Sequence, residues 1–243
     1  PSGKITKQSF HLFKIIDKCV KKFGCICIFI LQSAEKYDRI KMTAILPKCK
    51  VFFEPLPETD NFMLEEYYKN PKKYAFSMQT LLLALRFQAQ QEAQWRSTRG
   101  ELCIMDSSIY SDKAFLEVQK ACGYIDENEY KAYNKLCEIH FPFLQYPDLH
   151  LHLQLPIDEE INRIKKRSRN CECNIERSYL EKLHDAYNDL IQHLSRLYPV
   201  KIINADKPFD NVLEDCIQAI KQRSLELQEQ SKYPVYKKNT SYI

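Results

Sequence analysis

Carboxylate side chains that can do acid–base chemistry follow the apolar segments of this chain directly. Glu54 comes after the expected strand of residues 50–53 and is the candidate for this chemistry, while Asp106 opens a polar motif after the run of residues 102–105. A carboxylate in such a position can take a proton from a reacting hydroxyl group. The plain alternative for Glu54, which precedes Pro55, is that it only ends a strand. The choice between the two depends on the elements that position these side chains.

Apolar runs alternate with amphipathic segments along the chain, and this order predicts the fold class. Strands are expected at residues 25–31, 50–53, 102–105, 149–155 and 200–203. Helices are expected at residues 5–22, 37–46, 61–98 with a break near Pro71, 109–122, 126–140, 157–168, 177–197 and 209–229. The alternation predicts an α/β fold with a parallel five-stranded sheet and helices on both faces. The expected core includes Ile26, Ile28, Ile30, Val51, Ile104, Leu151, Leu153 and Ile202.

The composition fits one domain of this class. A chain of 243 residues suits a single α/β domain, expected at residues 25–230, with an amphipathic extension at 1–24 and a polar arm at 231–243. No apolar run approaches the length of a membrane span, so no direct span is expected. The net charge of +4 is mild and gives no indication of a nucleic-acid partner, and none is expected.

The cysteines and histidines do not form a metal-binding pattern. The chain has ten cysteines but no C-x-x-C pair, which favours free thiols in a reducing compartment over a zinc site. His150 and His152 alternate along one expected strand and share a face with Gln154, but no third ligand is nearby. We therefore expect no metal site and a sheet face that a helix covers.

An ordered series of short motifs resembles the deoxyribonucleoside kinase family, from about Cys25 to the last expected helix. In order, the motifs are FEPL at 53–56, YYKNPKKYAFSMQ at 67–79, Arg86, DSSIYSD at 106–112, RIKKRSRNCE at 163–172 and SYLEKLH at 178–184. Taken singly, each motif also fits a strand end or a solvated helix. Their joint order indicates the family, and the resemblance implies a P-loop kinase-like fold.

The resemblance implies a role for each matching residue. Glu54 matches the base that takes the proton from the sugar 5′-hydroxyl group. Gln79 presents its amide to the nucleobase, while Arg86 and Asp112 match the residues that hold the base and order the pocket. The remaining matches are Tyr68 and Glu172, for the sugar 3′-hydroxyl group, and the lid residues Arg163, Arg167 and Arg169, for the phosphates being transferred.

The phosphate-binding loop departs from the family pattern. A working loop reads G-x-x-x-x-G-K-[ST] after the first strand, whereas residues 31–37 read LQSAEKY, without glycine. Glycine lets successive backbone N–H groups converge on phosphate oxygens. Lys36 lies near the position of the loop lysine, but Tyr37 replaces the hydroxyl residue that holds Mg²⁺. Ser107 also stands where the family has a phosphate-contacting arginine, so phosphate transfer is expected to be lost.

Two functions are compatible with these observations. One branch of the family is a non-kinase accessory subunit of mitochondrial respiratory complex I, and residues 111–134 are similar to it in SDKAFLE, GYI and YN. The first hypothesis is a catalytically silent subunit of that complex, on the matrix side of the inner membrane, which needs no cofactor. The alternative is an active deoxyribonucleoside kinase that uses ATP. A protein that binds a nucleotide without turnover is a third option.

Overall fold

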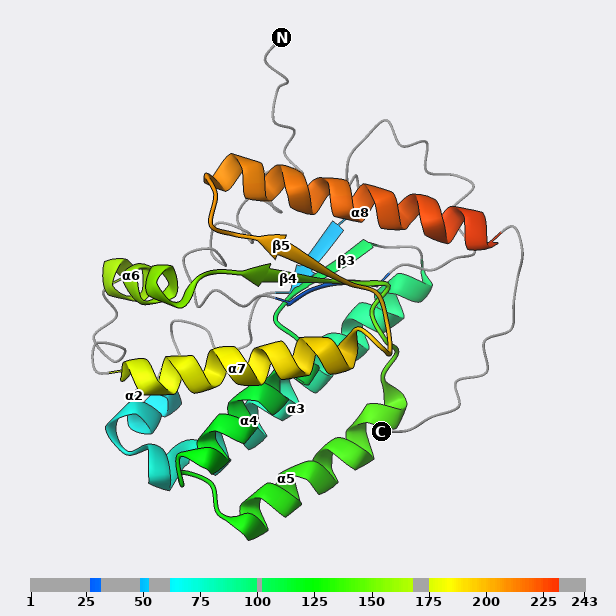
Figure 1. Cartoon of the computed structure of the whole chain (residues 1–243). Coiled ribbons are helices and arrows are strands. Elements are labelled where there is room, and N and C mark those ends of the chain that lie inside the picture. The colour runs from blue at the N-terminus through cyan, green and yellow to red at the C-terminus, as the bar shows by residue number, and fades with distance from the viewer. Residues whose placement is uncertain (1–26, 32–48, 53–61, 100–101, 168–174, 232–243) are drawn as a thin grey trace.

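One mixed sheet organises the described part of the chain. The computed structural model describes residues 27–31, 49–52, 62–99, 102–167 and 175–231 (Figure 1). Its five strands form a single sheet in the order β2-β3-β1-β4-β5. The strands are β1 (Cys27–Leu31), β2 (Cys49–Phe52), β3 (Leu102–Asp106), β4 (Leu149–Gln154) and β5 (Val200–Asn204).

The direction of β1 corrects the expectation of a wholly parallel sheet. β2 is parallel to β3, and β4 is parallel to β5, as expected. β1 lies between β3 and β4 and is antiparallel to both. The prediction failed here because β1 is a continuous apolar run, which reads the same in either direction. Only the connections before and after a strand fix its direction, and residues 1–26 and 32–48 lie outside the described residues.

The helices agree with the sequence pattern within a few residues. They are α2 (Phe62–Lys69), α3 (Pro71–Thr98), α4 (Asp112–Ala121), α5 (Glu127–His140), α6 (Ile157–Arg167), α7 (Arg177–Leu194) and α8 (Phe209–Ser231), with short 3₁₀ turns η2 (Ile109–Ser111) and η3 (Phe141–Phe143). The predicted break near Pro71 is confirmed. Asn70 caps α3 because its Oδ1 accepts a hydrogen bond from the Lys73 backbone N–H at 3.2 Å, and Pro71 is the first helical residue.

Helices cover both faces of the sheet, which confirms the α/β class. α8 lies on one side, and α3, α4, α5 and α7 lie on the other (Figure 1). On the α8 side, Ile104, Leu151 and Leu153 are buried as predicted. Ile202 was expected in the core but is 51% exposed, whereas Ile203 is buried. The reason is that β5 is an edge strand, and only the side of β5 that carries Ile203 packs against α8.

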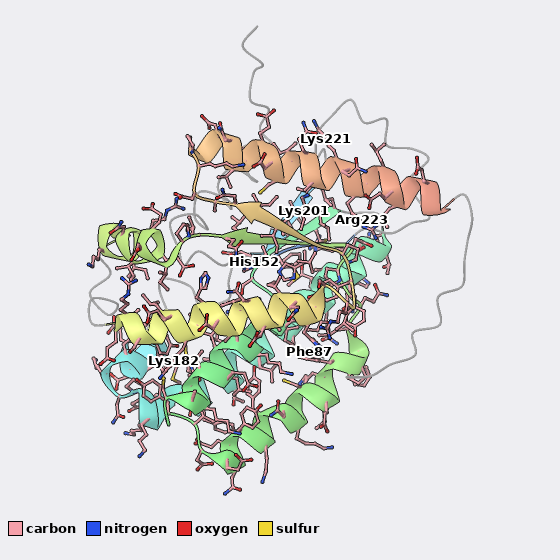
Figure 2. All side chains as sticks on the ribbon, in the orientation of Figure 1. Phe87, His152, Lys182, Lys201, Lys221 and Arg223 are labelled. Carbon is pink, nitrogen blue, oxygen red and sulfur yellow. The ribbon has the colours of Figure 1, made fainter. Side chains whose placement is uncertain are left out.

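The opposite side of β4 carries the two histidines, and the expectation of a helix-covered face is confirmed. His150 and His152 are buried; His150 stacks on Tyr198, and His152 stacks on Tyr187 of α7. His152 lies between the sheet and α7 (Figure 2). Burial lowers the pKa of His150 to about 3 and that of His152 to about 4, so both rings are neutral near pH 7. Within the described ranges, no group of three His, Cys, Asp or Glu side chains is placed to hold a metal ion.

Several expectations fall on residues that the structure does not describe. The expected helices at 5–22 and 37–46 and the core residue Ile26 lie outside the described residues, as do the extension 1–24 and all of the arm except Ser231. Of Ile28, Ile30 and Val51 only the backbone is described. Cys103, Cys122, Cys137 and Cys216 are free thiols, as the cysteine pattern predicted. No described helix is both long enough and apolar enough to span a membrane.

Candidate functional site

Three of the predicted site residues meet where α3 packs against the start of α4. Gln79 and Arg86 lie seven residues apart, so about two turns of helix place them on one face of α3. Arg86 Nη1 forms an ion pair with Asp112 Oδ1, and the two side chains are only 4% and 1% exposed. Gln79 Nε2 donates a hydrogen bond to the Asp112 carbonyl oxygen at 3.2 Å. We call Gln79, Arg86 and Asp112 the α3–α4 cluster.

The position of Asp112 explains how a buried carboxylate is tolerated in the α3–α4 cluster. Asp112 is the first residue of α4, where the helix dipole stabilises negative charge. Arg86 supplies the compensating positive charge, which a buried carboxylate requires. The pair also holds the guanidinium plane of Arg86 in a fixed orientation. A ligand at this cluster would therefore meet preset polar groups rather than mobile ones.

A strained turn leads from β3 into the α3–α4 cluster. Ser107 has a φ of 72°, in the left-handed region that a non-glycine residue rarely adopts. Ser108 is fully buried, and its Oγ accepts a hydrogen bond from the Ser111 backbone N–H at 3.2 Å, which shapes η2. Such strain persists only where the surroundings hold it, and it is common at functional sites. This turn places Asp112 beside Arg86.

Tyr68, predicted to lie near the sugar, is half-buried on α2 beside a buried hydrogen-bonded network. Its ring lies 5.3 Å from that of Tyr67. The Tyr67 hydroxyl group accepts a hydrogen bond from Gln119 Nε2 of α4 at 3.3 Å and lies 3.5 Å from the Tyr179 hydroxyl group of α7. Burial raises the pKa of Tyr67, so the hydroxyl group stays protonated. This network ties α2 to α4 and α7, and sequence reasoning did not identify it.

Arg163, predicted to contact phosphates, lies on a different element from the α3–α4 cluster. Its Nε donates to Glu159 Oε1 at 2.8 Å, and its Nη2 donates to the Ala205 carbonyl oxygen at 3.1 Å. The second bond ties α6 to the chain that follows β5. Of Arg167, which ends α6, only the backbone is described. The other predicted site residues, Lys36, Glu54, Arg169 and Glu172, lie outside the described residues.

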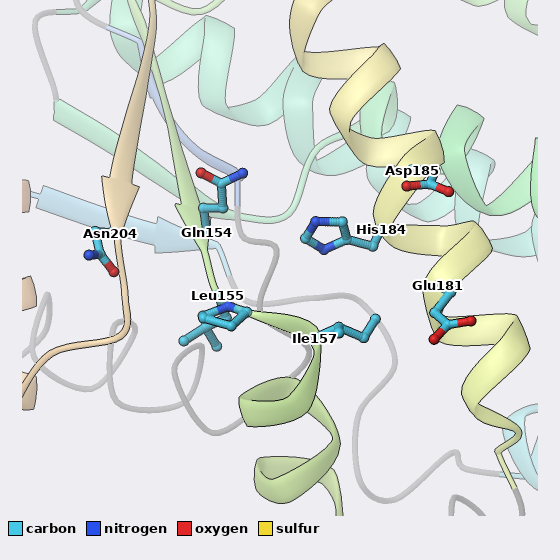
Figure 3. A pocket seen from close by; sticks show the side chains of 8 residues that line it. Gln154, Leu155, Ile157, Glu181, His184, Asp185 and Asn204 are labelled. Atoms are coloured by element: carbon cyan, nitrogen blue, oxygen red, sulfur yellow. The ribbon is translucent and has the colours of Figure 1, made fainter.

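A cavity of about 710 Å³ lies at the carboxyl ends of β4 and β5 (Figure 3). Its described lining residues are Gln154, Leu155, Pro156, Ile157, Glu181, His184, Asp185 and Asn204. None of them was predicted to bind a ligand. Two signals were present in the sequence: ligands of open α/β sheets bind beyond the carboxyl ends of strands, and β4 ends in the polar residue Gln154. Without the helix packing, however, nothing indicated that α7 would complete the wall.

Comparison with known proteins decides which family this combination of fold and cluster represents. The family model described as deoxynucleoside kinase matches residues 35–226. This chain belongs to the deoxynucleoside kinase family. The match covers every described element from β2 to β5 and most of α8. It includes all members of the α3–α4 cluster and confirms the family to which the ordered motifs pointed.

Both branches of the family that the motifs suggested appear among the relatives. Deoxyadenosine kinase of Dictyostelium discoideum is 39% identical over 145 residues, which are 60% of this chain and 58% of that protein. The mitochondrial NADH dehydrogenase (ubiquinone) 1 alpha subcomplex subunit 10 of Rattus norvegicus is 27% identical over 159 residues, which are 63% of this chain and 45% of that protein. This chain therefore spans about half the length of these two relatives.

A solved structure supports the fold. Deoxyadenosine kinase from M. mycoides with bound dATP superposes with a TM-score of 0.62 at 26% identity, covering 71% of this chain and 86% of that chain. The predicted α/β kinase-like fold is confirmed at this level.

Proposed function

We propose that this chain binds a deoxynucleoside and phosphorylates it slowly on the 5′-hydroxyl group, with ATP as the donor. Deoxyadenosine is the first substrate to test, because the relative at 39% identity is a deoxyadenosine kinase. In this proposal, Gln79 meets the edge of the base, and Arg86 and Asp112 hold it. Tyr68 and Glu172 bind the sugar 3′-hydroxyl group, and Glu54 takes the proton of the 5′-hydroxyl group.

The observation that carries the proposal is the buried Arg86–Asp112 ion pair beside Gln79. A buried ion pair is a poor scaffold element, since well-packed apolar residues in its place are often neutral or stabilising. A nucleobase, in contrast, has donors and acceptors that need fixed polar partners. A site built of such partners also rejects ligands that lack the matching groups. The two side chains of this pair are only 4% and 1% exposed, and this burial favours ligand binding over a purely structural role.

The phosphate side is the reason that we expect slow turnover. Residues 31–37 lack the glycines that form a backbone nest for phosphate, so ATP depends on Lys36 and on the lid residues Arg163, Arg167 and Arg169. Arg163 already pairs with Glu159, and in the proposed complex a phosphate oxygen would replace that carboxylate. Each lost contact in the transition state lowers the rate directly.

A phosphorylation assay tests the proposal. The chain is incubated with Mg²⁺-ATP and each of the four deoxynucleosides, and the 5′-monophosphate is quantified by mass spectrometry. Arg86→Met should lower product formation at least about tenfold, as expected when a charged hydrogen-bonding group is lost. Arg96→Met is the matched control, since Arg96 lies on the same helix and pairs with Glu92 at the surface. If wild-type protein yields no monophosphate from any deoxynucleoside, the kinase proposal fails.

A second candidate is the catalytically silent accessory subunit of respiratory complex I. The observation that favours it is the combination of the glycine-free loop with the 27% identity to the rat complex I subunit. Its partners would be other subunits of the complex on the matrix side of the mitochondrial inner membrane, with no cofactor of its own. This candidate predicts no monophosphate and co-migration with NADH dehydrogenase activity on a native gel of the source membranes. Migration as a free protein, apart from NADH dehydrogenase activity, would exclude it.

A further inference from the structure

The cavity beyond β4 and β5 has a wall that is rich in hydrogen-bond acceptors and carries negative charge. Glu181 and Asp185 lie one turn apart on α7, and Gln154 and Asn204 contribute amide groups from the two strand ends. The eight described lining residues include no Lys or Arg. A wall of this composition disfavours phosphate and other anions, and it favours a cation that donates hydrogen bonds.

A buried carboxyl group, that of Glu160, contacts His184 of the cavity wall and orients its ring. Glu160 of α6 is 7% exposed, and its Oε1 lies 3.6 Å from Nδ1 of His184, which is 25% exposed. Burial raises the pKa of Glu160. Because Nδ1 of His184 faces Glu160, Nε2 lies on the other side of the ring. The imidazole points toward Gln154 across the cavity (Figure 3). His184 thus presents a polar atom that a buried partner orients.

The two carboxylates of the rim are not equivalent. Glu181 Oε1 accepts a hydrogen bond from Arg177 Nε at 2.7 Å, so its charge is already partly compensated. Asp185 is exposed, and no described residue forms a hydrogen bond or an ion pair with it. Opposite these charges, Leu155, Pro156 and Ile157 supply an apolar wall. The cavity therefore offers a counter-ion at one side and a surface for a short hydrocarbon body at the other.

We propose that this cavity binds a small protonated amine, with Asp185 as its counter-ion and His184 and Gln154 as hydrogen-bond partners. The volume of about 710 Å³ lies within the range of about 300–1,000 Å³ that is typical of small-molecule sites. The inference goes beyond the proposed kinase reaction, although α6 also carries Arg163, the proposed phosphate contact, which is not among the described lining residues. The cavity is built from β4, β5, α6 and α7, whereas the α3–α4 cluster belongs to two other helices.

Calorimetry with a simple diamine tests this inference. Putrescine is titrated into the full chain, and 1,4-butanediol, which has the same carbon body and no charge, is titrated in parallel. Asp185→Asn should weaken putrescine binding about fivefold, which is the effect of losing one partly exposed ion pair. Asp189→Asn is the matched control, because Asp189 is exposed one turn further along α7 and does not line the cavity.

Two further readouts make the result specific to the site. The imidazole C–H resonances of His184, assigned with His184→Gln, should shift on addition of putrescine and not on addition of inorganic phosphate. Asp185→Asn should keep the wild-type melting temperature, since the residue is exposed. The inference is overturned if putrescine gives no heat, if 1,4-butanediol binds equally well, or if both aspartate variants weaken binding to the same extent.

Discussion

The Arg86–Asp112 ion pair gives the sharpest test of the described structure, through the change Arg86→Met. Methionine keeps most of the length of the side chain but removes the charge and the hydrogen-bond donors. Asp112, which is 1% exposed, would then be a buried carboxylate without its counter-ion. Removal of one partner from a buried pair lowers the free energy of unfolding by about 3–5 kcal/mol. We expect a loss of that size from Arg86→Met.

The partner change and the double change complete a thermodynamic cycle. Asp112→Leu alone should be similarly destabilising, because it leaves the guanidinium group of Arg86 buried and uncompensated. The double variant Arg86→Met/Asp112→Leu removes both charges and should recover most of the loss, since an apolar pair of similar volume is often neutral or stabilising. The two changes should therefore be strongly non-additive, as expected for residues in direct contact.

Urea denaturation followed by circular dichroism measures each free energy of unfolding. The pair Arg96–Glu92 is the control, because it is an exposed i,i+4 pair on the same helix and Arg96→Met should cost only about 0.3–0.5 kcal/mol. If Arg86→Met loses less than about 1 kcal/mol, the pair behaves like a surface ion pair. That result, or additive effects in the double variant, would refute the reasoning.

Two further predictions concern the sheet. Leu151→Ala should lower the free energy of unfolding by about 2–5 kcal/mol, whereas Ile202→Ala, at an edge position that is 51% exposed, should cost less than about 1 kcal/mol in the same denaturation assay. Burial lowers the pKa of His150 to about 3 and that of His152 to about 4, from an ordinary value of 6.5. At a pH below about 6.5 and above these lowered values, the unfolded chain therefore binds more protons than the folded chain. The contribution of the neutral histidines to the free energy of unfolding should be complete above about pH 6.5 and should fall as the pH decreases toward about 4. His152→Phe should make this pH dependence shallower. An unchanged pH dependence in this variant would contradict the lowered pKa of His152.

The succession of strands and helices was predictable because it depends on local patterns. Pro71 indicated the break between α2 and α3, and the alternation of leucine with histidine in β4 indicated which residues share a face of the sheet. Ile202 shows the limit of such patterns. Its neighbours predicted a strand, but its exposure depends on β5 being at the edge, which is a property of the whole sheet.

The candidate site was predictable only in part, for the same reason. Gln79, Arg86 and Asp112 were identified through ordered motifs, and the structure brings them together through an ion pair and a hydrogen bond. The Tyr67–Gln119–Tyr179 network and the cavity beside His184 depend on contacts between helices far apart in the chain. No local pattern encodes such contacts. The direction of β1 was predicted wrongly because a continuous apolar run reads the same in either direction along the chain.

The central claim is that the α3–α4 cluster recognises a deoxynucleoside, and titration calorimetry tests it most directly. Each of the four deoxynucleosides is titrated into wild-type protein, Gln79→Ala, and the control Gln88→Ala, which alters an exposed residue of the same helix. The account predicts saturable binding of at least one deoxynucleoside, with a dissociation constant between about 1 μM and 1 mM. It also predicts that Gln79→Ala weakens this binding several-fold and that Gln88→Ala does not. Flat heats for all four deoxynucleosides, or equal binding by Gln79→Ala and wild type, would contradict it.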